Sequence, residues 1–301
     1  MELIFSDETI NDTDKRHIVD FITKKVEEFD LDLKDLEKIV LTKDYFKEVE
    51  QAYNDIGKQG KGASDNSMAK GMAIAVHNKA PDPKSKVVVL ISKNEWGKLL
   101  SKQQNEIDFC THVINHELAH VHDDTLKHGL IYSYEMKRGY HSDLKFHLRC
   151  EADEVWSEYI AERLSAPTVT REFVDTIKNN TYNQLRKLFN SHSENSSFLF
   201  RAWRNQNTYD NFRFHIDYVL KSLAHLLGIL HGLGDDHELT IEIDKDVRQW
   251  LGSSKLVNVW DSMGMNLSNL YDEYPVWDDI QELDGLGECI LHSWKGFGYF
   301  D

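Results

Sequence analysis

The sequence predicts an α+β protein whose strands lie mainly in the first half of the chain. Two observations lead to this class. Short apolar runs typical of strands occur before residue 93, with one further short run at residues 239–243. Longer stretches with apolar residues three or four positions apart, typical of amphipathic helices, dominate after residue 167.

The first part of the chain is expected to alternate strands and helices. Ile18, Phe21 and Ile22 belong to a helical stripe, whereas runs rich in β-branched residues indicate strands. Two such runs flank a turn with two prolines, which predicts a β-hairpin. The expected elements are a strand at 1–6, a helix at 12–29, a strand at 36–42, a helix at 44–57, a flexible loop at 57–71, and hairpin strands at 72–78 and 86–92.

Two long helices are expected in the middle of the chain. The first begins at a capping box, Ser101 with Gln104, and ends at Gly129. The second, at residues 142–165, ends because Pro167 follows. Further helices are expected at 171–189, 212–234 and 244–251, with a short strand at 239–243.

Residues 212–234 are expected to form a buried helix. Apolar side chains occur on nearly every side of this stretch, which is typical of a helix buried in a core. The second of the two long helices ends before Pro167, so we expect a first domain at 1–167 and a mainly helical region at 168–301, with one integrated fold as the alternative. The second region is expected to pack against the first and to form one wall of a cleft.

Charge and cysteine content restrict the partners and the compartment. The formal net charge of −16 argues against nucleic-acid or anionic-membrane binding, since such partners need a basic face. No apolar run approaches the roughly twenty residues of a membrane span, and the N-terminus lacks a signal-peptide pattern. Cys110, Cys150 and Cys289 are scattered, which suits a reducing compartment. We expect a cytoplasmic protein; its oligomeric state does not follow from the sequence.

The stretch VINHELAHVHDD, residues 113–124, carries the strongest candidate site. On a helix, His116 and His120 lie one above the other and can present two imidazole nitrogens to one zinc ion. Glu117 points about 100° away, where a carboxylate reaches a water on the zinc but not a ligand position. The neighbouring residues are mostly apolar, so the helix is expected to be buried. The spacing predicts a zinc site with Glu117 as general base.

A third protein ligand is expected from another element, because a catalytic zinc has three protein ligands and one open position. Glu151, Glu154, Glu158 and Glu162 fall along one helical stripe that is flanked by apolar residues. A buried carboxylate needs a metal ion or a hydrogen-bond donor. The stripe therefore supplies the candidates for the third ligand, and its spacing alone does not choose among them.

These two motifs together resemble those of the gluzincin metallopeptidases. HELAH is followed after thirty-seven residues by EYIAERLSAP, which is similar to the Glu-x-x-Ala-(Asp/Asn) segment of the ImmA/IrrE-like and CAAX-endopeptidase-like branches. The resemblance covers residues 36–167 and implies a zincin-like domain, with a small sheet over the active-site helix. It implies Glu158 as the third zinc ligand and Glu162, in place of the usual Asp or Asn, as the residue that steadies a ligand histidine. Glu154 as the ligand, with Glu158 as its partner, is the competing assignment.

The function implied is that of a zinc-dependent endopeptidase, a hydrolase that cleaves a specific intracellular protein. One zinc ion per chain, bound by His116, His120 and Glu158, would polarise a water molecule and the substrate carbonyl. Glu117 would take the proton of that water and pass it to the leaving amine. A hydrogen-bond donor for the oxyanion is also expected. Its candidates are Tyr132, Tyr134, Tyr140, His141, His231, His292 and Tyr299.

Two other classes of function remain open at the level of the sequence. The chain can be a zinc-binding regulatory or interaction protein on a zincin scaffold, with little or no turnover, or a zinc hydrolase that acts on a non-peptide amide. Glu117 favours an enzyme, because metal binding does not require that residue. His112, one turn before His116, can line the cleft, although a structural role is the better interpretation.

Overall fold

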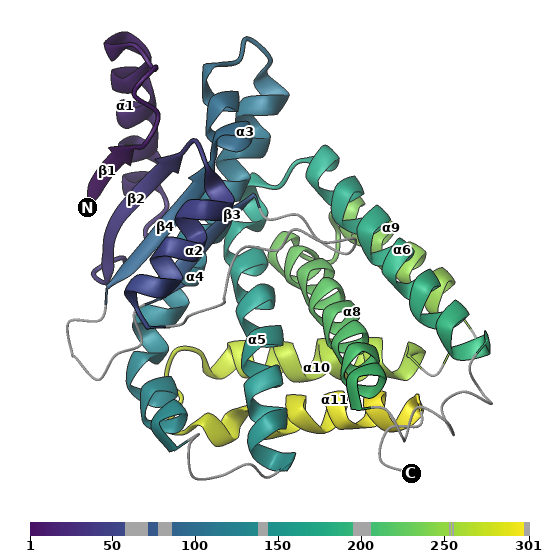
Figure 1. Cartoon of the computed structure of the whole chain (residues 1–301). Coiled ribbons are helices and arrows are strands. Elements are labelled where there is room, and N and C mark those ends of the chain that lie inside the picture. Colours follow the sequence, from purple (N-terminus) through teal and green to yellow (C-terminus); the bar gives the residue numbers. More distant parts are fainter. Residues whose placement is uncertain are drawn as a thin grey trace. The chain divides into compact units, whose positions relative to one another are not determined.

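The computed structural model describes residues 1–57, 72–77, 86–137, 144–194, 206–252, 254 and 256–297, with only the backbone described for 128–137, 191–194 and 206–212. The architecture is α+β, as the sequence predicts, with a small mixed sheet and many helices (Figure 1). Its internal contacts divide the chain into two compact units. Unit 1 comprises Met1–Tyr132 and Leu164–Thr170, and unit 2 comprises Ser133–Arg163 and Arg171–Asp301. The boundary near Pro167 stays a prediction.

Unit 1 contains the four-stranded sheet, in the order β1-β2-β4-β3. The strands are β1 (Glu2–Phe5), β2 (Leu36–Thr42), β3 (Ala73–His77) and β4 (Val87–Ser92). β2 pairs in parallel with both β1 and β4, and β3 is antiparallel to β4. The predicted hairpin strands therefore pair, while the predicted turn between them and the loop that precedes them lie largely outside the described residues.

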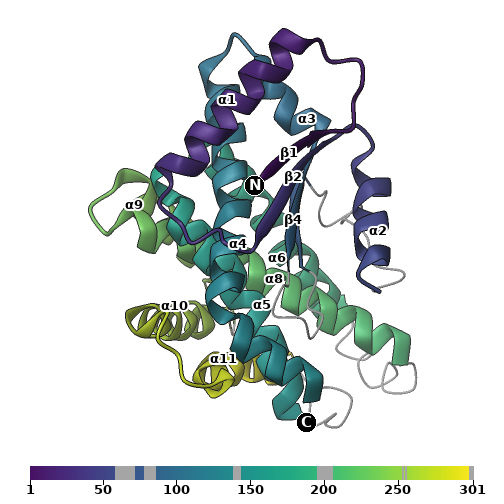
Figure 2. The same cartoon turned by 90° about the vertical axis from the view of Figure 1, so that its left-hand side faces the viewer.

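Helices cover both faces of this sheet. On one face, α1 (Asp12–Glu28) and α4 (Gln104–Lys137) pack against β2 and β4; on the other face lies α2 (Tyr45–Asp55), as Figure 2 shows. The side chains of β2 divide accordingly: Ile39 and Leu41 enter the first core, and Val40 enters the second. The short helices α3 (Lys93–Trp96) and η1 (Gly97–Leu100) connect β4 to α4. A strand buried on both faces needs apolar residues at successive positions, which explains the run IVL in β2.

The motif helix α4 is longer than predicted. It runs from Gln104 to Lys137 and passes through Gly129, which was expected to end it. A glycine inside a helix costs only about 1 kcal/mol relative to alanine, so the residues around it can outweigh its effect. The helix begins at Gln104, within a turn of the predicted start, but the predicted capping box is wrong. Ser101 accepts a hydrogen bond from the backbone amide of Gln103, and the side chain of Gln104 donates to Asp108 and not to Ser101.

Unit 2 is helical, and α8 lies at its centre. The helices are α5 (Leu144–Ser165, of which 144–163 belong to this unit), α6 (Arg171–Glu194), α8 (Gln206–Leu233), α9 (Glu238–Leu251), α10 (Val257–Glu273), η3 (Ile280–Leu283) and α11 (Asp284–Gly296). α8 contacts α6, α9, α10 and α11. Ile216, Leu223 and Ile229 of α8 are fully buried, as predicted for a helix that is apolar on nearly every side. Phe214 is an exception and is 53% exposed.

The short strand predicted at residues 239–243 is wrong, because these residues form the first turns of α9. Leu239, Ile243 and Val247 are buried, whereas Ile241 is 60% exposed. Burial therefore recurs every four residues, as in a helix, and not every second residue, as in a strand. His237 caps this helix by accepting a hydrogen bond from the backbone amide of Leu239.

Each unit contains a buried cysteine. Cys110 in α4 and Cys289 in α11 are buried, and the three cysteines form no disulfide.

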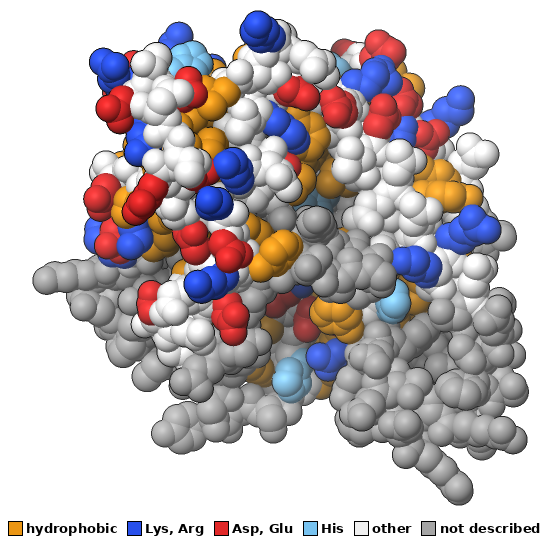
Figure 3. Space-filling view, turned by 45° about the horizontal axis from the view of Figure 1, so that its top comes forward, with side chains coloured by type: hydrophobic (Ala, Val, Ile, Leu, Met, Phe, Trp, Pro, Cys, Tyr) orange, Lys and Arg blue, Asp and Glu red, His pale blue; other side chains and the backbone are white. Residues whose placement is uncertain are grey.

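On the face drawn in Figure 3, acidic and basic side chains are interspersed among uncharged ones within the described part of the chain. No described helix combines the length and the apolar character needed to cross a membrane.

Candidate metal centre

The two motif histidines lie next to one another on α4, in unit 1. Their Nε2 atoms are 3.0 Å apart, and their ring centroids are 4.6 Å apart. Two nitrogens that are each about 2.0–2.1 Å from a tetrahedral zinc are separated by about 3.3 Å. The two Nε2 atoms are at hydrogen-bond distance, and a small change would bring them to the separation of two zinc ligands. Positions four apart on a helix thus lie together as the sequence predicts, and their binding of zinc stays a prediction.

Glu117 is buried on the same helix and is 7% exposed. Its negative charge acts on Tyr45, at the start of α2: burial, and then the charge of Glu117, raise the pKa of Tyr45 well above its usual value. The phenol of Tyr45 therefore stays protonated. Burying a carboxylate away from water costs several kcal/mol unless it is compensated. A carboxylate in this position, directly after a ligand histidine, can act as a proton acceptor.

The other histidines of the motif have structural partners within unit 1. His112 is fully buried, and its Nδ1 lies 3.3 Å from the hydroxyl of Thr168 in η2 (Ala166–Thr168). Asn115 donates a hydrogen bond to the same hydroxyl. His122 accepts a hydrogen bond of 2.8 Å from the backbone amide of Asp32, and burial lowers the pKa of this histidine. These contacts support the structural role expected for His112.

Unit 2 contains the glutamate stripe of α5, and the members of this stripe lie near basic side chains of α8. Glu151 lies 3.9 Å from Arg213, and Glu154 pairs with Lys221. The side chain of Glu154 is 58% exposed, which is more than that of Lys221. An exposed carboxylate that is neutralised by an ammonium group has less need of a metal ion than a sheltered one. The structure thus gives no support to Glu154 as the ligand.

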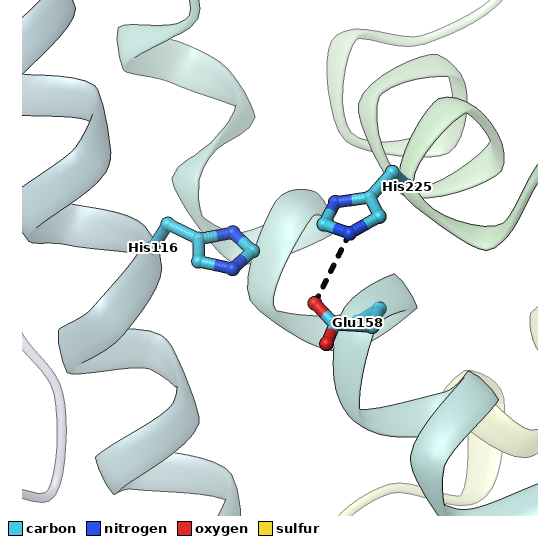
Figure 4. A group of neighbouring side chains, drawn as sticks. All are labelled: His116, Glu158 and His225. Carbon is cyan, nitrogen blue, oxygen red and sulfur yellow. Dashed lines mark ion pairs between the residues drawn. The ribbon is translucent and has the colours of Figure 1, made fainter. Parts of the chain in front are cut away.

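Glu158 and Glu162 both contact His225, on α8 in the same unit. Oε2 of Glu158 lies 3.2 Å from Nε2 of this histidine, and Oε1 of Glu162 lies 2.9 Å from its Nδ1. Glu162 is fully buried. Figure 4 draws His225 with Glu158, and its dashed line marks their ion pair; it also draws His116, from α4. Each of the three offers an atom that can bind a metal ion.

The sequence analysis did not identify His225. Its signal was a histidine within the apolar run of residues 223–227 of α8, where a polar side chain needs a partner. A second signal is Gly228, on the same face three residues later. A Cβ at Gly228 would lie 2.5 Å from the carbonyl oxygen of Tyr159 and 2.7 Å from Cβ of Glu162. The absence of that atom lets α8 approach α5 closely enough for His225 to reach both glutamates.

The candidates for the oxyanion donor have different outcomes. His231 on α8 lies 2.8 Å from the hydroxyl of Tyr159, and burial lowers the pKa of this histidine to about 4. His292 is exposed on α11. The remaining candidates, Tyr132, Tyr134, Tyr140, His141 and Tyr299, lie outside the residues whose side chains are described. Among these candidates, His231 is thus a neutral histidine whose Nδ1 is already at hydrogen-bond distance from Tyr159.

Comparison of the chain with protein-family models, curated proteins and solved structures finds no match.

Proposed function

We propose that this chain is a zinc-dependent endopeptidase, in which His116, His120 and Glu158 bind one zinc ion and Glu117 is the general base. The observation that carries the proposal is the H-E-x-x-H motif on a buried helix, with its two imidazole nitrogens 3.0 Å apart. The donor set of two imidazoles and one carboxylate is one that catalytic zinc uses. The gluzincin resemblance of residues 36–167 supports the same assignment.

The zinc ion, when bound, would supply a Lewis acid for the substrate carbonyl and would lower the pKa of a water molecule. Glu117 would accept the proton of the attacking water at a carboxylate oxygen and donate it to the amine that leaves. The imidazoles of His116 and His120 would act only as neutral ligands, each through Nε2. Glu158 would contribute one negative charge to the ligand set, so that its carboxylate offsets part of the charge of the cation.

We further propose a narrow substrate choice within the cytoplasm. The zincin motifs end near residue 167, and the remaining helical region must have another role. In the proposed arrangement it forms one wall of the cleft and restricts access to a specific protein or peptide. The net charge of −16 is consistent with a substrate that is neither a nucleic acid nor an anionic membrane.

The substitution Glu117→Gln tests the proposal. The variant should retain one zinc ion per chain, because the residue is not a ligand, and its hydrolysis of a cleaved substrate should fall by about 10²–10⁴-fold. The measurements are zinc content by plasma mass spectrometry and proteomic identification of cellular proteins that the wild type cleaves. Asp108→Asn, an equivalent change at an exposed position of the same helix, is the control and should leave both quantities unchanged.

A second function is favoured by one observation, the contact of His225 with Glu158. A zinc ion with four protein ligands is typical of structural sites, in which no open position is left for water. Such a centre would belong to a zinc-binding regulatory or interaction protein with little turnover. An unchanged rate in Glu117→Gln, or the absence of any cleaved protein, would favour this function over the endopeptidase.

A further inference from the structure

We infer that His225 is a ligand of the same zinc ion that Glu158 is proposed to bind, and that Glu162 fixes the orientation of its ring. The inference rests on the proposed zinc site. Because a tetrahedral zinc ion with four protein ligands has no open position for water, it favours the second function named above over hydrolysis. It assigns a fourth ligand residue from α8, far in the sequence from the H-E-x-x-H motif. It also identifies His225 as the histidine that Glu162 orients. The gluzincin resemblance implies only that Glu162 steadies a ligand histidine.

The contact between Glu162 and His225 has the form that steadies metal-binding histidines. Oε1 of Glu162 lies 2.9 Å from Nδ1 of His225, and Glu162 is fully buried. A histidine that binds a metal through one nitrogen commonly donates its other N–H to a carboxylate, which fixes both the tautomer and the orientation of the ring. The tautomer with its proton at Nδ1 has a lone pair at Nε2, which is the atom that would bind the cation.

The contact of Nε2 with Glu158 agrees with the spacing of two ligands. The distance from Nε2 to Oε2 of Glu158 is 3.2 Å. Hydrogen bonds from nitrogen to oxygen extend to about 3.2 Å, and two neighbouring ligands of a tetrahedral zinc are about 3.3 Å apart, so this distance is compatible with both. An Nε2 atom without a proton and a carboxylate oxygen both present lone pairs, so a cation bound to both would stabilise their contact. The competing explanation is a proton on Nε2, which would make the ring a cation between two carboxylates.

The backbone holds His225 in this position. His225 and Gly228 lie one turn apart on α8, and a Cβ at Gly228 would lie 2.5 Å from the carbonyl oxygen of Tyr159 on α5. The ligand pair of unit 2 is therefore carried by two helices in close backbone contact. Metal sites need such support, because ligand atoms must be held to within about 0.5 Å.

A cysteine at position 225 provides a direct test of ligation. In the full-length chain loaded with Co²⁺, His225→Cys should show a near-ultraviolet thiolate-to-cobalt charge-transfer band that the wild type lacks. The wild type contains Cys110, Cys150 and Cys289, so its spectrum accounts for the native thiols. His231→Cys, the same change at a histidine of α8 that bonds Tyr159, is the matched control and should show no such band.

Two further measurements make the outcome decisive even if the cysteine variant folds poorly. X-ray absorption of the zinc-loaded wild type should count three imidazole ligands, and Glu162→Gln should bind zinc about 10–100-fold more weakly. Two imidazoles, no charge-transfer band and an unchanged zinc affinity in Glu162→Gln would overturn the role of His225 while leaving the proposed function intact. A wild type that binds neither zinc nor cobalt would overturn both.

Discussion

Asp217 on α8 is a buried carboxyl group that is separate from the metal ligands. The indole N–H of Trp294 donates a hydrogen bond of 2.7 Å to it, and Arg213 lies 3.6 Å away. Burial, and then the negative charge of Glu151, raise the pKa of Asp217 to about 7, although Arg213 and Lys221 act in the opposite direction. Burial disfavours the charged form of an acid, which is the physical cause of the shift.

This shift predicts a pH-dependent stability. A carboxyl group whose pKa is raised on folding holds its proton longer in the folded state, so it lowers stability as pH rises from about 4 to about 7. Asp217→Asn removes the ionisation and keeps an acceptor for Trp294. The variant should become more stable relative to wild type between pH 5 and pH 8, by more than about 1 kcal/mol.

Urea unfolding at the two pH values measures this difference. Asp236→Asn, a change at an exposed position, should show no such dependence on pH and serves as the control. An equal effect of Asp217→Asn at both pH values would mean that Asp217 is ionised throughout this range.

Among the elements, the close approach of α5 and α8 depends on Gly228. Gly228→Ala should destabilise the protein by about 1–3 kcal/mol, because the added Cβ meets backbone atoms of α5 that cannot rotate away. It should also weaken zinc binding, since the helices must separate and His225 moves from the two glutamates. Urea unfolding and zinc titration measure the two effects.

Gly97→Ala is the control for this substitution, because nothing lies within 4 Å of a Cβ built there. It should be neutral or stabilising by up to about 1 kcal/mol, since alanine loses less backbone freedom on folding. If Gly228→Ala proves equally mild, the two helices give way at no cost, and the glycine does not position His225.

The elements differ in how far local sequence could predict them. The strands β2 and β4 and the helices α1 and α8 were predicted because the apolar spacing of each reflects its own burial. The prediction was wrong at residues 239–243, where Leu239, Ile241 and Ile243 alternate like a strand although the helix exposes Ile241. It also ended α4 too early at Gly129, because one unfavourable residue does not determine the end of a long helix.

The candidate site shows the same division between local and tertiary information. The pairing of His116 with His120 was predictable, since four residues along one helix fix their distance. The partner of Glu158 and Glu162 was not, because His225 comes from another helix, and only the packing of α8 on α5 brings it near. A histidine in an apolar run indicates a buried partner, but spacing along the chain does not identify that partner.

At the scale of the whole molecule, unit 2 includes most of α5, although this helix precedes Pro167 in the sequence. Trp156 of α5 is fully buried, with its ring 4.7 Å from that of Trp277, and Glu162 is paired with His225. A fragment of residues 1–167 would lose these partners. Exposing each large buried apolar side chain costs about 1.5–3 kcal/mol, so α5 should not fold stably within such a fragment.

The expected result is that limited proteolysis near Pro167 releases no folded, zinc-loaded fragment 1–167. Mass spectrometry of the protease-resistant products and the zinc content of the expressed fragment measure this. A fragment 1–167 that is stable and as active as the whole chain would show that residues 168–301 form an independent module, with a role outside the cleft.

The buried cysteines described above give each unit its own chemical reporter of local opening. Cys110 lies in the core of unit 1 and Cys289 in unit 2, and burial raises the pKa of both thiols. An alkylating reagent attacks the thiolate, so each residue reacts only while its surroundings are transiently open. Iodoacetamide labelling in mild urea, followed by peptide mass spectrometry, should therefore yield one modification rate for each unit. Equal rates at every urea concentration would mean that the two units open together; different rates would rank their stabilities without any engineered probe.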